Sequence, residues 1–368
     1  DEAVFSSTEY LFYGSKLTRE QAGTIASKLL ANELIQTVRV LSGEEVADGI
    51  PMNLPFVTAV NDVKVREYDL EVSDDELMEI SRKGILALSL DEMKAIQNYF
   101  RKAENRAEYG LGKNPTDVEL EVIAQTWSEH CKHKIFAAKV DYTDEETGEK
   151  QEITSCYKTF IQKSTKEIGE KVDFLVSVFK DNAGVIAFDR NWDACIKVET
   201  HNSPSALDPY GGALTGIVGV NRDPMGTGMG ANLLCNTDVF CFASPFYKGE
   251  LPPRLQHPRR VLEGVRRGVE DGGNKSGIPT VNGSVVFDDR YLGKPLVYCG
   301  TVGVITTDVN GRKGWEKKAE MGDIIVMTGG RIGKDGIHGA TFSSEELHEG
   351  SPATAVQIGD PITQRKMY

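Results

Sequence analysis

The sequence predicts an α+β protein with more than one domain, and three observations lead to this prediction. The chain has 368 residues, which exceeds the usual size of a single domain. In its first part, short apolar segments alternate with helices that begin at capping residues. From about residue 135 the chain is rich in strands and glycine and contains one clear helix, an order typical of an α+β domain.

Residues 1–86 are predicted to form a small domain with ferredoxin-like element order. Apolar segments predict strands at residues 10–13, 35–41, 56–60 and 63–70. Two capping boxes predict helices, and the second helix should end near Gly84. The capping pairs are Thr18 with Gln21 and Ser73 with Glu76.

Residues 87–133 are predicted to form a helical linker. Two further capping pairs open its helices, namely Ser89 with Glu92 and Thr116 with Glu119. The second helix places Leu120, Ala124 and Trp127 on one face. At its C-terminal end it delivers the sequence Ser128-Glu129-His130-Cys131, so chemistry is expected there.

Residues 134–320 are predicted to form a larger α+β domain, and residues 321–368 the start of another. Strands are expected at residues 185–188, 194–199, 239–242, 279–287, 296–304 and 324–327, with a helix at 259–271. A glycine-flanked polar loop follows at 333–340. Asp360-Pro361 opens a last helix, and because the sequence lacks an initiator Met and stops soon after this point, both ends are expected to be cuts in a longer chain.

Composition narrows the function classes. The formal net charge of −13 argues against a general nucleic-acid or membrane-surface binder, since both of those partners are anionic. The six cysteines form no CxxC pair, which favours a reducing, cytoplasmic location. The sequence contains no apolar run of about 18 residues and no signal peptide.

The densest cluster of chemically active residues is the segment Lys197-Val198-Glu199-Thr200-His201-Asn202, together with Arg222-Asp223 beyond a glycine run at 211–216. Carboxylates at 199 and 223 could hold Mg²⁺, while the neighbouring cations meet phosphate oxygens. This combination suits phosphoryl transfer. The alternative is a solvated loop with turn-forming glycines and an Arg222–Asp223 ion pair.

Two other patterns are weaker. The glycines at 226, 228 and 230 do not form GxGxxG, so a dinucleotide fold is disfavoured, although their backbone amides could cradle a phosphate. The run from Glu129 to His133 contains zinc-ligating residue types, but no second cluster lies at zinc-site spacing. A general acid/base or electrostatic role is therefore expected for His130, with a packed histidine as the alternative.

Taken together, these motifs resemble phosphoribosylformylglycinamidine synthase of the large, multidomain type. The resemblance rests on residues 115–120 (PTDVEL), 125–134 (QTWSEHCKHK), 198–205 (VETHNSPS), 212–230, 335–344 (DGIHGATFSS) and 357–361 (QIGDP). It implies a fold like that of aminoimidazole ribonucleotide synthetase, in which an N-terminal half pairs sheets into a barrel and a C-terminal half closes the site. The start of that C-terminal half is expected here.

The resemblance also implies roles for individual residues. His130 and His201 match the two active-site histidines. Lys197 and His133 match ATP contacts, and Glu199 and Asp223 match Mg²⁺ ligands. The residues that match substrate contacts are Thr200, His201, Asn202, Ser203, Arg222 and Gln357. Many members of the family carry a second histidine where this chain has Ser203.

The implied reaction converts formylglycinamide ribonucleotide to the amidine. ATP phosphorylates the amide oxygen, ammonia adds to the resulting intermediate, and phosphate leaves. Because the chain lacks the family's glutaminase nucleophile motif, ammonia is expected from a glutaminase domain outside it. Two alternatives remain, a related ATP-dependent synthetase or kinase of the same superfamily and a noncatalytic scaffold.

Overall fold

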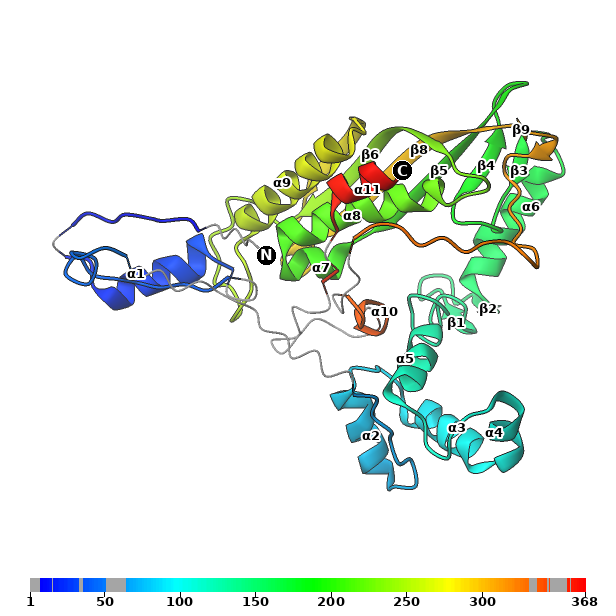
Figure 1. Cartoon of the computed structure of the whole chain (residues 1–368), viewed down its shortest axis with the longest axis horizontal. Coiled ribbons are helices and arrows are strands. Elements are labelled where there is room, and N and C mark those ends of the chain that lie inside the picture. Colours follow the sequence, from blue (N-terminus) through cyan, green and yellow to red (C-terminus); the bar gives the residue numbers. More distant parts are fainter. Residues whose placement is uncertain are drawn as a thin grey trace. The chain divides into compact units, whose positions relative to one another are not determined.

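The computed structural model describes residues 7–14, 16–32, 36–50, 64–330, 336–342, 344, 356–357 and 359–368. The chain divides into two compact units, residues 1–66 and 67–368. Figure 1 shows the order of the elements along the chain.

In the first unit, helix α1 (Arg19–Ile25) begins at the predicted capping box, in which Thr18 accepts a hydrogen bond from the Gln21 amide. It continues into a π-helical turn, η1 (Ala26–Leu30). The strands predicted at 10–13 and 35–41 are wrong wherever this unit is described, and the strand predicted at 56–60 lies outside the described residues. Tyr10 and Leu11 stay exposed, because no neighbouring strand covers them there.

The second unit opens with four helices, and the first, second and fourth of them share a core. They are α2 (Asp74–Lys83), α3 (Leu90–Arg101), α4 (Ala103–Tyr109) and α5 (Asp117–Thr126). The capping boxes predicted for α2, α3 and α5 all form. Leu77, Met93 and Leu120 pack together in this core with Ala124, so the helical face predicted for α5 is confirmed.

Helix α2 was expected to belong to the N-terminal domain, but it packs with the linker helices. The boundary between the two compact units lies between residues 66 and 67, whereas the sequence predicted a domain boundary between 86 and 87. The strand predicted at 63–70 is reduced, in its described part, to an isolated bridge between Glu67 and Thr116.

A six-stranded sheet forms the centre of the larger domain, with the order β3-β4-β5-β8-β6-β7. Its strands are β3 (Leu175–Ser177), β4 (Gly184–Ala187), β5 (Trp192–Thr200), β6 (Asn232–Phe242), β7 (Thr280–Phe287) and β8 (Leu296–Thr306). Only the β6–β7 pair is parallel, and α9 (Pro258–Ser276) is the crossover between these two strands. Five of the predicted strands are thereby confirmed, whereas β3 was not predicted.

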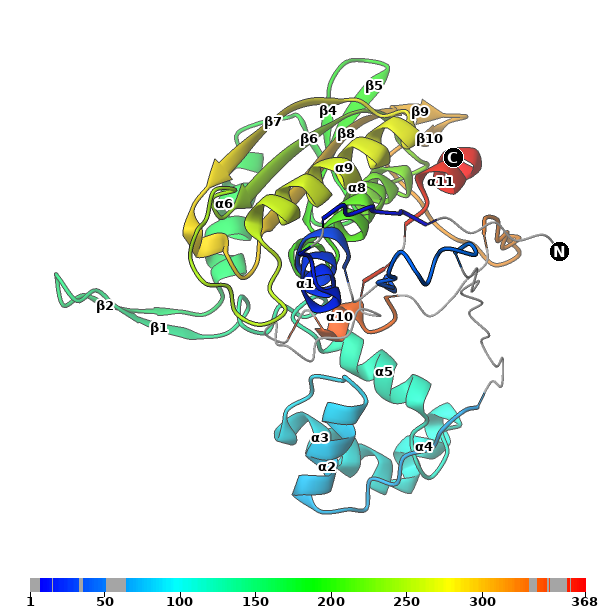
Figure 2. The same ribbon diagram turned by 90° about the vertical axis from the view of Figure 1, so that its left-hand side faces the viewer.

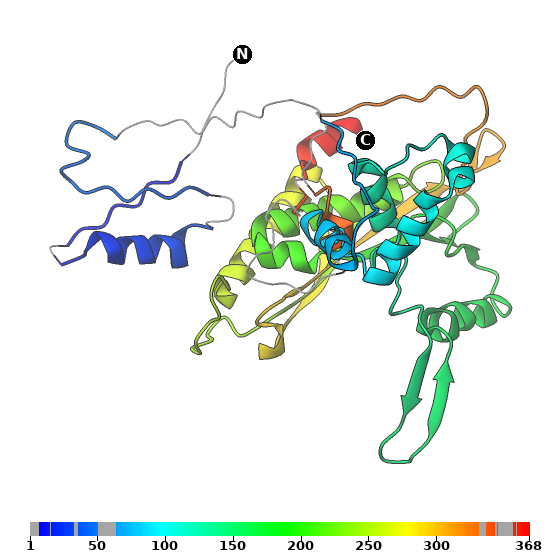
Figure 3. The ribbon, with the colours of Figure 1, turned by 90° about the horizontal axis from the view of Figure 1, so that it is seen from below.

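Several smaller elements precede, connect or follow the strands of this sheet. They are the hairpin β1 (Val140–Thr143) and β2 (Lys150–Ile153), the turn η2 (Tyr157–Gln162), α6 (Lys163–Gly169), the turn η3 (Asp289–Tyr291), and the hairpin β9 (Asp308–Val309) and β10 (Arg312–Lys313). Figure 3 shows β1 and β2 as a separate two-stranded ribbon.

Two long helices cover one face of the sheet, α9 and α8 (Pro209–Met225), and Figure 2 shows both along that face. Glycines bring them together. A Cβ at Gly268 would lie 2.4 Å from the Tyr210 carbonyl oxygen, and a Cβ at Gly272 would lie 2.9 Å from the Ile217 Cβ. The glycine run at 211–216 is therefore a packed helix, and the alternative of a solvated loop is wrong.

After β10 the described chain forms two short helices, α10 (Gly339–Phe342) and α11 (Pro361–Met367). The helix start predicted at Asp360-Pro361 is confirmed, since the Asp360 carboxylate accepts hydrogen bonds from the Ile362 and Thr363 amides. The strand predicted at 324–327 is wrong. Those residues are extended and almost fully exposed, without a partner strand in the described part of the chain.

Candidate active site

The candidate site lies where strand β5 ends against helix α8. Because side chains alternate along a strand, Lys197 and Glu199 share one face with the buried Cys195. This is the face that α8 covers. A short helix, α7 (Asn202–Leu207), connects β5 to α8, and His201 is its N-cap residue.

Lys197 joins the two candidate metal ligands. Its Nζ lies 2.7 Å from Asp223 Oδ2 and 3.9 Å from Glu199 Oε2. The two carboxylates come from β5 and from the last turn of α8, so folding brings together residues that are 24 positions apart. The alternative Arg222–Asp223 ion pair is wrong, because Asp223 pairs with Lys197.

Burial at this cluster raises the pKa of the Glu199 carboxyl. The nearby Lys197 ammonium opposes that shift and the Asp223 carboxylate adds to it. Two acidic groups that share one ammonium in a partly buried position would gain from a further cation.

The ring of His201 is held by a main-chain group. Its Nδ1 makes a short hydrogen bond with the carbonyl oxygen of Gly212 in the first turn of α8. Burial lowers the pKa of this imidazole, with a smaller contribution from the positive charge of Arg222. A neutral ring that donates through Nδ1 leaves Nε2 as a proton acceptor.

His130 follows the C-terminal end of α5 and lies close to the same cluster. Its charge acts on both the Glu199 carboxyl and the His201 ring, lowering the pKa of each. The end of the linker helix and the end of β5 therefore contribute to one site.

Arg222 connects the site to the last described segment. Its guanidinium donates to Gln357 Oε1 at 3.3 Å. The hydroxyl of Thr215, which is fully buried on α8, donates to the Gln357 carbonyl oxygen and accepts from the Gly359 amide. Thr215 lies within the glycine run at 211–216. The sequence did not predict its contact, because its partner Gln357 is 142 residues away.

The remaining predicted site residues are placed differently. Asn202 accepts a hydrogen bond from the Val297 amide of β8, and Ser203 is buried in α7. Thr200 is exposed at the end of β5, and His133 has a left-handed backbone with φ of 53°. Across the described ranges, no hydrogen bond or ion pair joins any of these four residues to Lys197, Glu199 or Asp223.

The backbone amides of the glycine loop at 226–230 do not form a phosphate-binding site, although the sequence suggested one as a possibility. The Gly228 amide donates to Asp181 Oδ2, and the Met229 amide donates to the Gly314 carbonyl oxygen. The other amides from 226 to 231 also donate to carbonyl oxygens of the protein. A Cβ at Gly228 would lie 2.3 Å from the Gly314 oxygen, so its glycine serves close packing.

The donor set suits a hard cation better than zinc. Within the described part of the chain, no group of three or more Cys, His, Asp and Glu side chains could hold a metal ion by itself. Mg²⁺ is commonly bound by one or two carboxylates together with substrate phosphates, so Glu199 and Asp223 fit that mode. All six cysteines are free thiols.

Helix α5 of the linker also forms hydrogen bonds with the segment 336–342. Glu121 of α5 lies 3.0 Å from His338 Nδ1, and Gln125 donates to the Ile337 carbonyl oxygen at 2.7 Å. The Glu121–His338 contact was not predicted, because neither residue stands in a motif that identifies the other.

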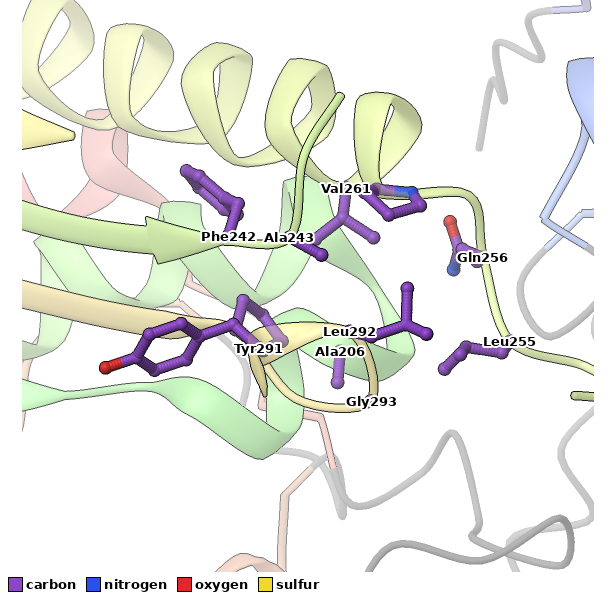
Figure 4. Close-up of a pocket in the computed structure, with 11 residues that line it drawn as sticks. Ala206, Phe242, Ala243, Leu255, Gln256, Val261, Tyr291, Leu292 and Gly293 are labelled. Atoms are coloured by element: carbon purple, nitrogen blue, oxygen red, sulfur yellow. The ribbon is translucent and has the colours of Figure 1, made fainter. Parts of the chain in front are cut away.

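A small apolar cavity lies elsewhere, between the start of α9 and the turn η3 (Figure 4). Phe242, Val261 and Leu292 are among the residues that line it, and its volume of about 10 Å³ is near the minimum for one water molecule. It contains none of the predicted site residues.

Comparison with known proteins identifies relatives of this chain. Residues 77–134 match the formylglycinamide ribonucleotide amidotransferase linker domain, and residues 180–305 match the N-terminal domain of AIR synthase related proteins. The phosphoribosylformylglycinamidine synthase subunit PurL of Thermoplasma volcanium is 36% identical over 310 residues, which cover 83% of this chain and 35% of that protein. The same subunit of Staphylococcus haemolyticus is 37% identical over 286 residues, covering 76% and 34%.

Among solved structures, T. maritima PurL complexed with FGAR is similar, with a TM-score of 0.47 and 29% identity over 73% of this chain and 35% of that one. The chain thus spans about a third of the length of the curated relatives it matches. No described helix is long and apolar enough to cross a membrane. The linker match, the synthetase-like match and the PurL relatives show that the chain belongs to the phosphoribosylformylglycinamidine synthase family.

Proposed function

We propose that this chain supplies the ATP and Mg²⁺ side of an enzyme that converts formylglycinamide ribonucleotide to formylglycinamidine ribonucleotide in purine biosynthesis. The observation that carries the proposal is the convergence of Glu199 and Asp223 on Lys197, beside His201 and His130. The names of the curated relatives support the same reaction.

In this proposal Glu199 and Asp223 hold Mg²⁺, which when bound offsets negative charge on the transferred phosphoryl group. Lys197 and His133 contact ATP. The γ-phosphoryl group passes to the amide oxygen of the substrate, giving ADP. Ammonia from a glutaminase domain outside this chain then adds to the amide carbon of the substrate. The bond from that carbon to the phosphorylated oxygen breaks, and the oxygen leaves as part of inorganic phosphate.

The proposed substrate contacts are Thr200, His201, Asn202, Ser203, Arg222 and Gln357. Arg222 is suited to an anionic substrate because its planar guanidinium can donate in parallel to two oxygens. His201, neutral near pH 7 because burial lowers its pKa, can take a proton at Nε2 during ammonia addition. We also propose a cytoplasmic location, in keeping with six free thiols.

Calorimetric titration of this chain with ATP tests the metal assignment. Binding should require Mg²⁺, and Asp223→Asn should weaken it at least tenfold, about 1.4 kcal/mol, because one of two anionic oxygen donors becomes neutral. Glu263→Gln is the matched control, since Glu263 pairs with Arg259 on the exposed side of α9. Metal-independent binding, or equal losses in both variants, would refute the assignment.

A related synthetase or kinase of the same superfamily is the second candidate, because its phosphoryl-transfer site would use the same carboxylates. The linker match favours the first candidate. Product analysis of the complete enzyme separates them, since only the first forms an amidine from ammonia.

A further inference from the structure

A second cavity, with a polar lining, lies in the linker, away from the candidate active site. It has a volume of about 110 Å³ and is bounded by the segment before α2, by α3 and α4, and by the loop after α4. Its charged and polar lining consists of Glu71, Gln97, Arg101, Arg106, Lys113 and Asn114. We call it the linker cavity.

Positive charge in the linker cavity is only partly neutralised. Glu71 is the one acidic residue in its lining, and Arg101 occupies both oxygens of that carboxylate with hydrogen bonds of 2.8 and 2.9 Å. The Arg101 guanidinium lowers the pKa of Glu71, and the charge of Lys113 lowers it further. Arg106 and Lys113 form no ion pair with any residue in the described part of the chain.

The Arg106 guanidinium lines the linker cavity and has an unsatisfied donor. Its Nε is buried without a hydrogen-bond partner among the described residues, although it lines a cavity large enough for several atoms. A guanidinium N–H that is removed from water without a partner costs free energy, so proteins normally satisfy such groups. The neighbouring Gln97 directs its Nε2 to the Leu70 carbonyl oxygen at 2.6 Å, and it makes no hydrogen bond with Arg106 Nε.

We propose that the linker cavity binds a phosphate group, with Arg106 as the central donor and Lys113 and Asn114 at its rim. Phosphate suits the site because its several oxygens can accept from the Arg106 guanidinium, including Nε, while Lys113 supplies a point charge. The volume exceeds the minimum for one water about sevenfold or more, which leaves room for a tetrahedral oxyanion. The protein is acidic overall, so this concentration of cations is a local feature.

The phosphate can be free or carried by a small sugar, and a titration separates these sources. Inorganic phosphate, and in a second arm ribose 5-phosphate, is added to the ¹⁵N-labelled chain up to about 10 mM, tenfold above a millimolar Kd. The Arg106 Nε–Hε resonance and the amides of residues 110–114 report on this cavity alone, independently of phosphate bound at Lys197. Saturable shifts are expected in at least one arm, and the tighter arm identifies the source.

Arg106→Gln should weaken these shifts at least tenfold, and Lys113→Gln severalfold. Arg82→Gln is the matched control, because Arg82 is an exposed linker arginine that pairs with Glu79. If Arg106→Gln fails to fold, the same titration is made with Lys113→Gln and with Arg106→Lys, which keeps the positive charge. Shifts that do not saturate, or that persist unchanged in these variants, would show that the cavity holds only water and would overturn the proposal without affecting the proposed active site.

Discussion

Glu199 carries the clearest conflict between stability and function at the residue scale. Because burial raises its pKa, the folded state keeps the Glu199 proton to higher pH than the unfolded chain does. The folded state is therefore penalised as pH rises above the unfolded pKa and through the raised folded value, and the penalty is absent in acid. Such strained charges are typical of binding sites that await a cation.

Glu199→Gln should accordingly raise the unfolding temperature at pH 7 and lose this advantage towards pH 4. The Glu199 side chain is 43% exposed, so solvent screens much of this penalty and the expected gain is only about 2–4 °C, which corresponds to about 1 kcal/mol. Thermal unfolding monitored by circular dichroism across that pH range makes the comparison, with Glu263→Gln as the control. A variant less stable than the wild type at pH 7 would show that the Lys197–Glu199 attraction outweighs burial.

A pair of substitutions at His201 separates structure from chemistry. His201→Asn retains a donor near the position of Nδ1 for the Gly212 carbonyl oxygen but lacks Nε2, whereas His201→Ala loses both. In the complete enzyme, kcat should fall by about 10²–10⁴ in both variants. The alanine variant should lose about 1 kcal/mol more stability than the asparagine variant. Turnover by His201→Asn within tenfold of the wild type would rule out Nε2 as the proton acceptor.

At the scale of elements, helix α8 was the main feature missed from the sequence. Glycine has low helix propensity, so the run at 211–216 indicated turns. Tertiary packing overrides this preference, since Gly212 lies against the backbone of α7 and Gly216 lies against His201 and Cys299. A helix held by contacts with distant residues cannot be recognised from local sequence.

Two glycine substitutions in α8 test this explanation. A Cβ at Gly212 would lie 2.4 Å from the Ser205 amide nitrogen, so Gly212→Ala should destabilise the fold by about 1–3 kcal/mol. A Cβ at Gly219 meets only the end of the Arg222 side chain at 3.6 Å, so Gly219→Ala should stabilise the helix by about 0.5–1 kcal/mol. Chemical denaturation measures both, and equal effects would contradict the packing account.

Other elements were predictable because their causes are local. The capping boxes at Ser73, Ser89 and Thr116 depend on residues three positions apart, and each forms. Five of the six strands in the central sheet were predicted from their apolar segments. The segments at 10–13 and 324–327 have similar composition but no partner strand in the described residues, so strand composition alone was insufficient.

The candidate site was predictable in part for the same reason. Lys197, Glu199 and His201 stand together in one motif, and the short motif at 222–223 suggested their partners. Which cation pairs with Asp223 depends on how α8 packs on β5, so the sequence alone left the Arg222–Asp223 ion pair open as an alternative. The Thr215–Gln357 contact likewise required the folded chain.

For the molecule as a whole, the sheet face opposite α8 and α9 is unusually apolar. The exposed side chains on it include Ile186, Ile196, Val198 and Val286, and no described helix covers them. A contiguous apolar surface of this kind marks an interface. This face is therefore expected to be covered by another apolar surface.

The chain studied alone should therefore self-associate through this face. Ile186→Lys should shift it towards the monomer in sedimentation velocity experiments across a concentration series, because a charged side chain cannot be buried there without a partner. Ile168→Lys is the matched control, as Ile168 is comparably exposed on α6. Equal sedimentation of both variants and the wild type would indicate that the face is not an association surface.

The central claim is that Glu199 and Asp223 hold the metal for phosphoryl transfer, and ammonia-dependent amidine formation by the complete enzyme tests it most directly. Asp223→Asn and Glu199→Gln should each lower kcat by at least 10²-fold, about 2.7 kcal/mol in barrier, while the folded fraction at the assay temperature stays unchanged. Turnover by either variant within tenfold of the wild type would contradict the account and place the metal elsewhere.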